Sequence, residues 1–339
     1  MLSQEMKLAN RLLEQNKARE AMDHYRRIIS EDADNAQAYC NMGSALFQQG
    51  ELSEAENYFK LSLSKDNNLK EAYFNLGCLY QDRGEFENAL SVYKDAIKRQ
   101  QDDAETFVRM GKCAIALNRI EDGLRFYEEA FRLRPNDLDY GAALVSSYIE
   151  ASQPKKAEKV LRILLVSYPE EVHLHFTLAL ILKDLKQFDS ALAHFNKVVL
   201  LDEENSEGFY HLADCCLNLN LIEQAESFFA KAYDLDHTFH EAVLRLAQLY
   251  ENAGNSEAAV DAYCRWIEMI EKRIWQYDES LQNTFDDACR MLAAHFKEKG
   301  ESDKGDAYLK KIQNPERNEV FPQEQKQTSD YRVSLSIDD

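Results

Sequence analysis

Residues 70–103 read KEAYFNLGCLYQDRGEFENALSVYKDAIKRQQDD. The small and apolar residues of the first half share one face at helical spacing: Tyr73, Leu76, Gly77 and Tyr80. Gly84 then interrupts the pattern, and the second half resumes it with Ala89, Tyr93 and Ala96. The stretch therefore predicts two helices joined by a short turn, which is a helical hairpin.

The same pattern recurs at a step of 34 residues, without a gap, in eight copies that run from Leu2 to Arg273. The eighth place, where the two helices approach closely, is small in seven copies: Ala9, Gly43, Gly77, Gly111, Val145, Ala179, Ala213 and Ala247. The twentieth place is small in all eight, from Ala21 to Ala259. The twenty-fourth place is large: Tyr25, Phe59, Tyr93, Tyr127, Leu161, Phe195, Phe229 and Tyr263. Alternating small and large places predict interlocking hairpins.

A 34-residue helix-turn-helix period with these small and aromatic places resembles the tetratricopeptide repeat. The resemblance covers residues 2–273 and implies an all-α fold, a right-handed α-solenoid superhelix of eight tandem repeats. It also implies that the first helices line a concave groove, with their second, fifth, sixth, ninth, twelfth and thirteenth places facing a ligand. The fifth repeat departs from the pattern because Gly141 replaces a large aromatic residue and Val145 a small one. We expect looser packing there.

The residues after Arg273 divide into three further segments. Residues 274–285 have no place in the 34-residue frame, and we expect them to lengthen the second helix of the eighth repeat, either packing locally or offering a docking or homodimer surface. Residues 286–313 restore the frame and predict a ninth, divergent hairpin that caps the array. Residues 314–339 lose all periodicity, which predicts a disordered C-terminal tail. Its last nine residues alternate apolar and polar side chains, so they could instead add to a sheet edge or lie in a groove.

The composition excludes several classes of partner. The 60 Asp and Glu outnumber the 40 Lys and Arg, giving a formal net charge of -20. Nucleic acids and anionic membranes need a basic surface, so we expect neither as a partner. No stretch approaches the ~18 apolar residues of a membrane helix, and the start lacks the basic and apolar regions of a signal peptide. We therefore expect a cytoplasmic protein.

The sequence carries no recognisable catalytic signature. It has no GxSxG motif, no phosphate-binding loop, and no CxxC among its seven cysteines. His211, Asp214 and Cys215 share one helical face, but no second half-site repeats their spacing. We expect no enzyme, no metal site and no cofactor.

The candidate site is therefore the groove that the resemblance implies. At the fifth place no residue is charged from the second repeat onward, which predicts an apolar stripe along the first helices. Asn41 and Asn75, at the sixth place of adjacent repeats, could hydrogen-bond the backbone of a ligand. The residues predicted to bind a partner, called here the groove residues, are Asn41, Phe47, Glu71, Phe74, Asn75, Cys78, Val108, Lys112, Phe176, Leu180, Tyr210, Asp214 and Leu244.

These observations favour a scaffold or adaptor that binds a polypeptide segment, apolar with basic flanks, in the groove. Apolar anchors would supply affinity, and acidic groove residues would speed association. Two alternatives stay open: a chaperone for an aggregation-prone or secreted client, and a regulatory subunit of an enzyme complex.

Overall fold

The computed structural model describes residues 2–99, 104–271 and 279–313, and within these ranges every regular element is a helix. The first compact unit, which ends at Ser167, holds α1 (Leu2–Glu14), α2 (Ala18–Glu31), α3 (Ala36–Gln48), α4 (Leu52–Lys65), α5 (Lys70–Asp82), α6 (Phe86–Arg99), α7 (Ala104–Ala116), α8 (Ile120–Leu133), α9 (Leu138–Glu150) and α10 (Pro154–Ser167). The second, which begins at Tyr168, holds α11 (Val172–Asp184), α12 (Phe188–Leu201), α13 (Ser206–Asn218), α14 (Ile222–Leu235), α15 (His240–Asn252), α16 (Ser256–Ile270), α17 (Glu279–Glu298) and α18 (Ser302–Ile312). The all-α prediction is confirmed.

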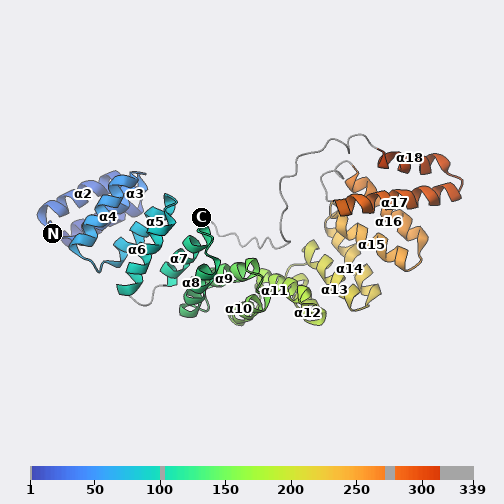
Figure 1. Ribbon diagram of the computed structural model, residues 1–339, viewed down its shortest axis with the longest axis horizontal. Helices are drawn as coiled ribbons and strands as arrows, with labels where there is room; N and C mark the ends of the chain where they lie inside the picture. The colour runs from blue at the N-terminus through green and yellow to red at the C-terminus, as the bar shows by residue number, and fades with distance from the viewer. Residues whose placement is uncertain (1, 100–103, 272–278, 314–339) are drawn as a thin grey trace. The chain divides into compact units, whose positions relative to one another are not determined.

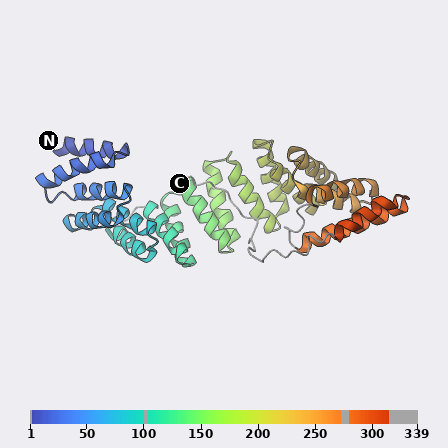
Figure 2. The same cartoon turned by 90° about the horizontal axis from the view of Figure 1, so that it is seen from above.

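The helices form consecutive hairpins, as the repeat frame predicts (Figure 1). Each odd-numbered helix is the first helix of a repeat and packs against the even-numbered second helix that follows it. Within each unit, the second helix also packs against the first helix of the next repeat. Figure 2 shows the same succession from above. Each unit is thus a solenoid built from neighbour contacts alone.

The small and large places interlock as expected. A Cβ added at Gly77 would lie 2.3 Å from Cε1 of Tyr93, and one at Gly43 or Gly111 would meet the equivalent ring at 2.7 Å. These glycines therefore let the first helix rest directly on the aromatic ring of the second. The rings at the twenty-fourth place are fully buried in five repeats: Tyr25, Phe59, Tyr93, Phe195 and Phe229.

The turn between the two helices of each repeat has one backbone conformation. Its central residue, at the fifteenth place, has a positive φ between 55° and 80° in all eight repeats: Asn16, Gly50, Gly84, Asn118, Ser152, Lys186, Asn220 and Gly254. Gly300 repeats it in the ninth hairpin with φ 82°. Gly and Asn adopt this left-handed conformation most readily, so Ser152 and Lys186 hold it against their intrinsic preference.

In the fifth repeat, a large residue compensates for the small Gly141. A Cβ at Gly141 would lie 2.6 Å from Cδ1 of Leu164, and Leu164 is fully buried. At Gly141 itself the packing is therefore close, because a large side chain on the second helix occupies the space that the missing aromatic leaves, and looser packing of the repeat as a whole stays a prediction. Pro154 begins α10, where its missing N–H costs no hydrogen bond.

The boundaries of the ninth hairpin also differ from the expectation. The second helix of the eighth repeat ends at Ile270, and residues 279–285, which were expected to lengthen it, belong to α17. Phe285 is buried with its ring centroid 6.2 Å from that of Trp266, so this packing draws 279–285 into the first helix of the ninth hairpin, together with 286–298. Residues 272–278 and the tail 314–339 lie outside the described residues, and the docking or homodimer surface at 274–285 stays a prediction.

Candidate functional site

All thirteen groove residues lie on first helices, in the six repeats that begin with α3, α5, α7, α11, α13 and α15. Glu71 and Lys112 are exposed, and the other eleven are half-buried. The predicted apolar stripe at the fifth place is interrupted, however, because its members Cys40 and Ala142 are buried, with 1% and 5% exposure. A half-buried side chain both packs within the protein and reaches the surface, so its contacts decide whether it is available to a partner.

The two asparagines connect neighbouring first helices. Asn41 donates from Nδ2 to Oδ1 of Asn10 at 2.8 Å and accepts at Oδ1 from Gln37 at 2.9 Å. Asn75 donates from Nδ2 to Oγ of Ser44 at 3.0 Å. Both Nδ2 and Oδ1 of Asn41 therefore form hydrogen bonds within the chain. Asn75 donates within the chain from Nδ2, whereas its Oδ1 accepts no hydrogen bond from the described residues.

Phe74 and Cys78 are anchored against the buried Tyr93. The Phe74 ring centroid lies 6.3 Å from that of Tyr93, and the guanidinium of Arg109 lies 5.7 Å from the Phe74 centroid. Tyr93 hydroxyl donates to Gln81 Oε1 at 2.6 Å and contacts Cys78 Sγ at 3.5 Å. Burial raises the pKa of the Cys78 thiol, so it stays protonated and unreactive at neutral pH.

In the second unit, Phe176 belongs to an aromatic and polar cluster that spans α11 and α13. Its ring centroid lies 5.7 Å from those of both Phe195 and His211. Lys183 Nζ lies 3.1 Å from His211 Nδ1. An ammonium group can only donate, so Nδ1 is the acceptor and the imidazole carries its proton on Nε2. That nitrogen lies 3.8 Å from Oε1 of Glu207, and the interaction with His211 lowers the pKa of the Glu207 carboxyl.

Asp214 links the first helices α11, α13 and α15. Its Oδ2 lies 3.4 Å from Lys183 Nζ, and its Oδ1 lies 3.8 Å from Nη2 of Arg245. The Asp214 side chain is only 18% exposed, whereas that of Arg245 is 44% exposed. The carboxylate is thus largely committed to its two cations, while Arg245 keeps donors that face solvent.

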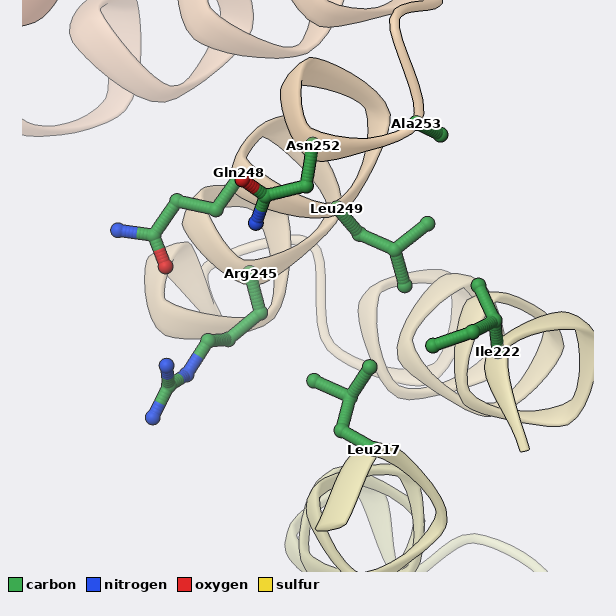
Figure 3. A pocket seen from close by; sticks show the side chains of 7 residues that line it. All are labelled: Leu217, Ile222, Arg245, Gln248, Leu249, Asn252 and Ala253. Carbon is green, nitrogen blue, oxygen red and sulfur yellow. The ribbon is translucent and has the colours of Figure 1, made fainter. Parts of the chain in front are cut away.

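A pocket of about 310 Å³ lies beside this cluster, bordered by the ends of α13 and α15 and the start of α14 (Figure 3). It is lined by Leu217, Ile222, Arg245, Gln248, Leu249, Asn252 and Ala253. Figure 3 shows the apolar side chains of Leu217, Ile222 and Leu249 converging, with Arg245 and Gln248 beside them. The arrangement offers an apolar surface for a side chain and polar groups for a peptide backbone.

None of the groove residues lines this pocket, although Asp214 contacts its rim through Arg245. Leu217, Arg245, Gln248 and Asn252 occupy the twelfth, sixth, ninth and thirteenth places, all assigned to the groove by the resemblance. Ile222 was missed because it begins a second helix, which the groove template does not include. Its 41% exposure, unusual for isoleucine, is a property of the folded chain.

The candidate metal ligands form no metal site. Cys215 is fully buried, and burial raises its pKa to about 12, while Asp214 is held by the two cations described above. Among the described residues, no group of three or more His, Cys, Asp or Glu side chains could hold a metal ion. In the same part of the chain, no helix combines the length and apolar character needed to cross a membrane.

The fold and the first-helix surface define an all-α repeat solenoid of the kind that binds other proteins. Family models described as tetratricopeptide repeat match residues 12–76 and 80–144, residues 142–199 and 176–237, and residues 240–273. The chain therefore belongs to the tetratricopeptide repeat family. The resemblance inferred from the 34-residue period is confirmed. No curated protein matches the sequence significantly.

Comparison with solved structures finds similar chains at low sequence identity. The structure of Naa15/Naa10 bound to HypK-THB is 15% identical, with 92% of this chain and 51% of that chain covered and a TM-score of 0.57. A tetratricopeptide repeat protein from Parabacteroides merdae is 17% identical over 69% of this chain and 93% of that one, with a TM-score of 0.45. YrrB, a TPR protein with an unusual peptide-binding site, is 18% identical over 65% and 96%, with a TM-score of 0.34.

Proposed function

We propose that this chain is a non-enzymatic adaptor that binds a segment of another polypeptide along its first helices. In the second unit, an apolar side chain of that segment enters the pocket formed by α13, α14 and α15. The observation that carries the proposal is the composition of this pocket. Four apolar side chains line it, three of them large, and Arg245, Gln248 and Asn252 bring donors and acceptors to its rim.

The pocket suits an anchor residue of a peptide. Its volume of about 310 Å³ accommodates a large aliphatic or aromatic side chain together with part of the adjoining backbone. Gln248 and Asn252 supply amide groups that pair with backbone N–H and C=O groups. Two exposed acids, Glu207 and Glu241, stand in the first turns of α13 and α15 and would attract basic residues flanking the anchor.

The pocket is also the cleanest place to test binding. A charge at Phe74 or Phe176 would disturb their contacts with buried rings as well as any partner. Ala253 is exposed and has φ -78°, a conformation open to any residue. Ala253→Trp would therefore fill the pocket without removing a core contact.

The experiment selects binders from a library of 16-residue peptides displayed on phage, using the full chain as bait. Burying one large apolar side chain contributes about 1.5–3 kcal/mol, so we expect Ala253→Trp to weaken the selected peptides about tenfold or more. The matched control is Ala151→Trp, at the same place of the fifth repeat, and it should leave their affinity unchanged. Peptides that bind both variants equally well would place the site elsewhere.

Two further assays, of client aggregation and of copurification, distinguish the two alternatives. A chaperone would lower the rate at which an aggregation-prone client forms particles, and Ala253→Trp would abolish that protection. A regulatory subunit would copurify with one enzyme at a fixed stoichiometry.

A further inference from the structure

The second helix of the fifth repeat, α10, breaks a rule that the other repeats follow. In the other seven repeats the second helix has an acidic residue in its first turn: Glu20, Glu54, Glu87, Glu121, Asp189, Glu223 and Glu257. The first turn of α10 has no acid and instead carries Lys155 and Lys156. Cations at this end oppose the helix dipole. Lys156 gains contacts with Glu128 at 3.6 Å and with the Tyr148 ring at 5.2 Å, so the cation that folding leaves unexplained is Lys155. A local rule broken without a compensating contact points to a role in binding.

The basic residues of α10 form one stripe with exposed apolar residues. At 100° per residue, one face of α10 presents Lys155, Lys159, Arg162, Ile163 and Val166, all of them exposed. The opposite face presents the buried residues Ala157, Val160, Leu161 and Leu164. The stripe, called here the α10 stripe, is about 16 Å long and points away from the core of its unit.

The positive charge of α10 is only partly neutralised by its surroundings, since Lys156 pairs with Glu128 at 3.6 Å and Arg162 with Glu158. Helix α10 carries four basic residues against Glu158, a net charge of +3, in a chain of net charge -20. Arg162 donates to Glu158 at 2.9 Å. Neither Lys155 nor Lys159 pairs with an acid in the described part of the chain. On the preceding second helix, by contrast, Arg132 pairs with Glu129 at 2.8 Å.

The carboxyl-terminal end of the stripe is apolar. Ile163 is 45% and Val166 83% exposed. The place of Val166 holds Lys98 in the third repeat and Arg132 in the fourth, so it faces solvent throughout the first unit and needs no apolar side chain for folding. A contiguous basic and apolar surface on the outer helices is a feature that core packing leaves unexplained.

We propose that the α10 stripe is a second docking surface, separate from the groove, for an acidic amphipathic helix of another protein. Carboxylates of that helix would pair with Lys155 and Lys159, and its apolar side chains would cover Ile163 and Val166. A partner of three or four turns matches the length of the stripe. With the groove, this surface gives the adaptor two sites for two different segments.

Charge decides between a protein segment and an anionic lipid surface. Interactions between exposed charges fade beyond a Debye length of about 8 Å at physiological salt. A single acidic helix bound to the stripe would lie within that distance of the stripe and of few other charges of the chain. A membrane surface extends far beyond the stripe, and the net charge of -20 on the chain opposes its approach. The stripe therefore favours a narrow acidic ligand.

The test uses the phage peptide library described above on the full chain and two sets of variants. The first set is Lys155→Glu with Lys159→Glu, and Val166→Ser alone. The matched control is Lys94→Glu with Lys231→Glu, two exposed lysines on α6 and α14 that give the same change of net charge. We expect a class of acidic, amphipathic peptides that bind about tenfold or more weakly to both α10 variants and equally well to the control and to Ala253→Trp.

Several results would overturn the proposal. The first is a selection that yields no acidic amphipathic peptides. The second is peptides that bind the α10 variants as tightly as the native chain. The third is an equal loss of affinity in the control variant, which would show that only the net charge of the chain matters. Binding of the full chain to vesicles containing phosphatidylserine that Lys155→Glu with Lys159→Glu abolishes would assign the stripe to a membrane. Self-association that this variant abolishes in sedimentation would assign it to a second copy. The melting temperature of the variant should stay close to that of the native chain, since both lysines are exposed and only Lys155 lies in the first turn of the helix.

Discussion

Replacing Gly77 by valine tests the packing on which each repeat depends. A Cβ at this position would lie 2.3 Å from Cε1 and 2.5 Å from Cζ of Tyr93, far inside van der Waals contact. The Tyr93 ring is fully buried, and its hydroxyl donates to Gln81 at 2.6 Å. Making room for valine therefore requires moving the ring and breaking that hydrogen bond.

The expected cost follows from three contributions. Overpacking a core costs about 1–3 kcal/mol, and the two methyl groups of valine place this site at the upper end. Losing the Tyr93 hydrogen bond adds about 1 kcal/mol. The higher helix propensity of valine over glycine returns about 0.4 kcal/mol. We expect Gly77→Val to lower the free energy of unfolding by about 3.5 kcal/mol.

A second substitution should restore part of this loss. The fifth repeat pairs Val145 with Leu161 at the same two places. Tyr93→Leu alone leaves a void beside Gly77 and costs about 2 kcal/mol. In the double variant valine fills that void, so the total loss should also be about 2 kcal/mol, well below the sum of the single losses.

The assay is urea unfolding of the full chain followed by circular dichroism at 222 nm, with the unfolding slope checked in every variant because repeat arrays can unfold in parts. The matched control combines Tyr93→Leu with Gly43→Val, whose clash is with Phe59 instead. The losses in free energy of unfolding caused by these two substitutions should add. Strict additivity of Gly77→Val and Tyr93→Leu would refute the account of the small and large places.

Two further predictions concern stability. Lys186→Gly should stabilise the chain by about 0.5–1 kcal/mol in the same urea titration, because Lys186 holds a left-handed φ of 58° that glycine adopts freely. Gly84→Ala, at the equivalent φ of 73°, should destabilise the chain. A loss of stability in the first variant and a gain in the second would contradict the argument. The pKa of Glu56 is lowered to about 2, chiefly by a hydrogen bond from Lys60 and also by one from Arg83. Since the folded pKa lies below the ordinary value of 4.5, this carboxylate stabilises the fold above about pH 4.5 and ceases to do so as the pH falls through 2. Glu56→Gln should therefore destabilise the chain by about 1 kcal/mol at pH 7 and by almost nothing near pH 2, measured as melting temperature against pH.

The sequence predicts the repeat boundaries of the first eight repeats because each place in the frame has a local cause. Gly77 and Tyr93 are needed within one hairpin, and a 34-residue comparison finds them. Packing in the fifth repeat is harder to predict because it depends on pairs of places. The small Gly141 is matched by the large Leu164, and neither residue taken alone reveals the exchange.

The candidate site was harder to predict for a related reason. Asn41 has a residue type and place suited to ligand binding, yet Asn10 of the preceding repeat uses its donor. Ile222 lies outside the groove template but lines the pocket. Residues 279–285 belong to α17, where Phe285 packs against Trp266 of the preceding repeat, a contact that the 34-residue frame does not predict. In each case the important contact joins two residues that the 34-residue period does not identify as neighbours.

The shared left-handed turn makes the number of repeats an adjustable property of the chain. Because the fifteenth place has the same conformation in every repeat, a cut after this residue in one repeat can be rejoined after it in another without a new backbone geometry. Removing residues 51–84, for example, joins Gly50 to Glu85 and leaves a turn of the same kind. Gene duplication or deletion in 34-residue steps can therefore lengthen or shorten the binding surface while each remaining hairpin keeps its own core.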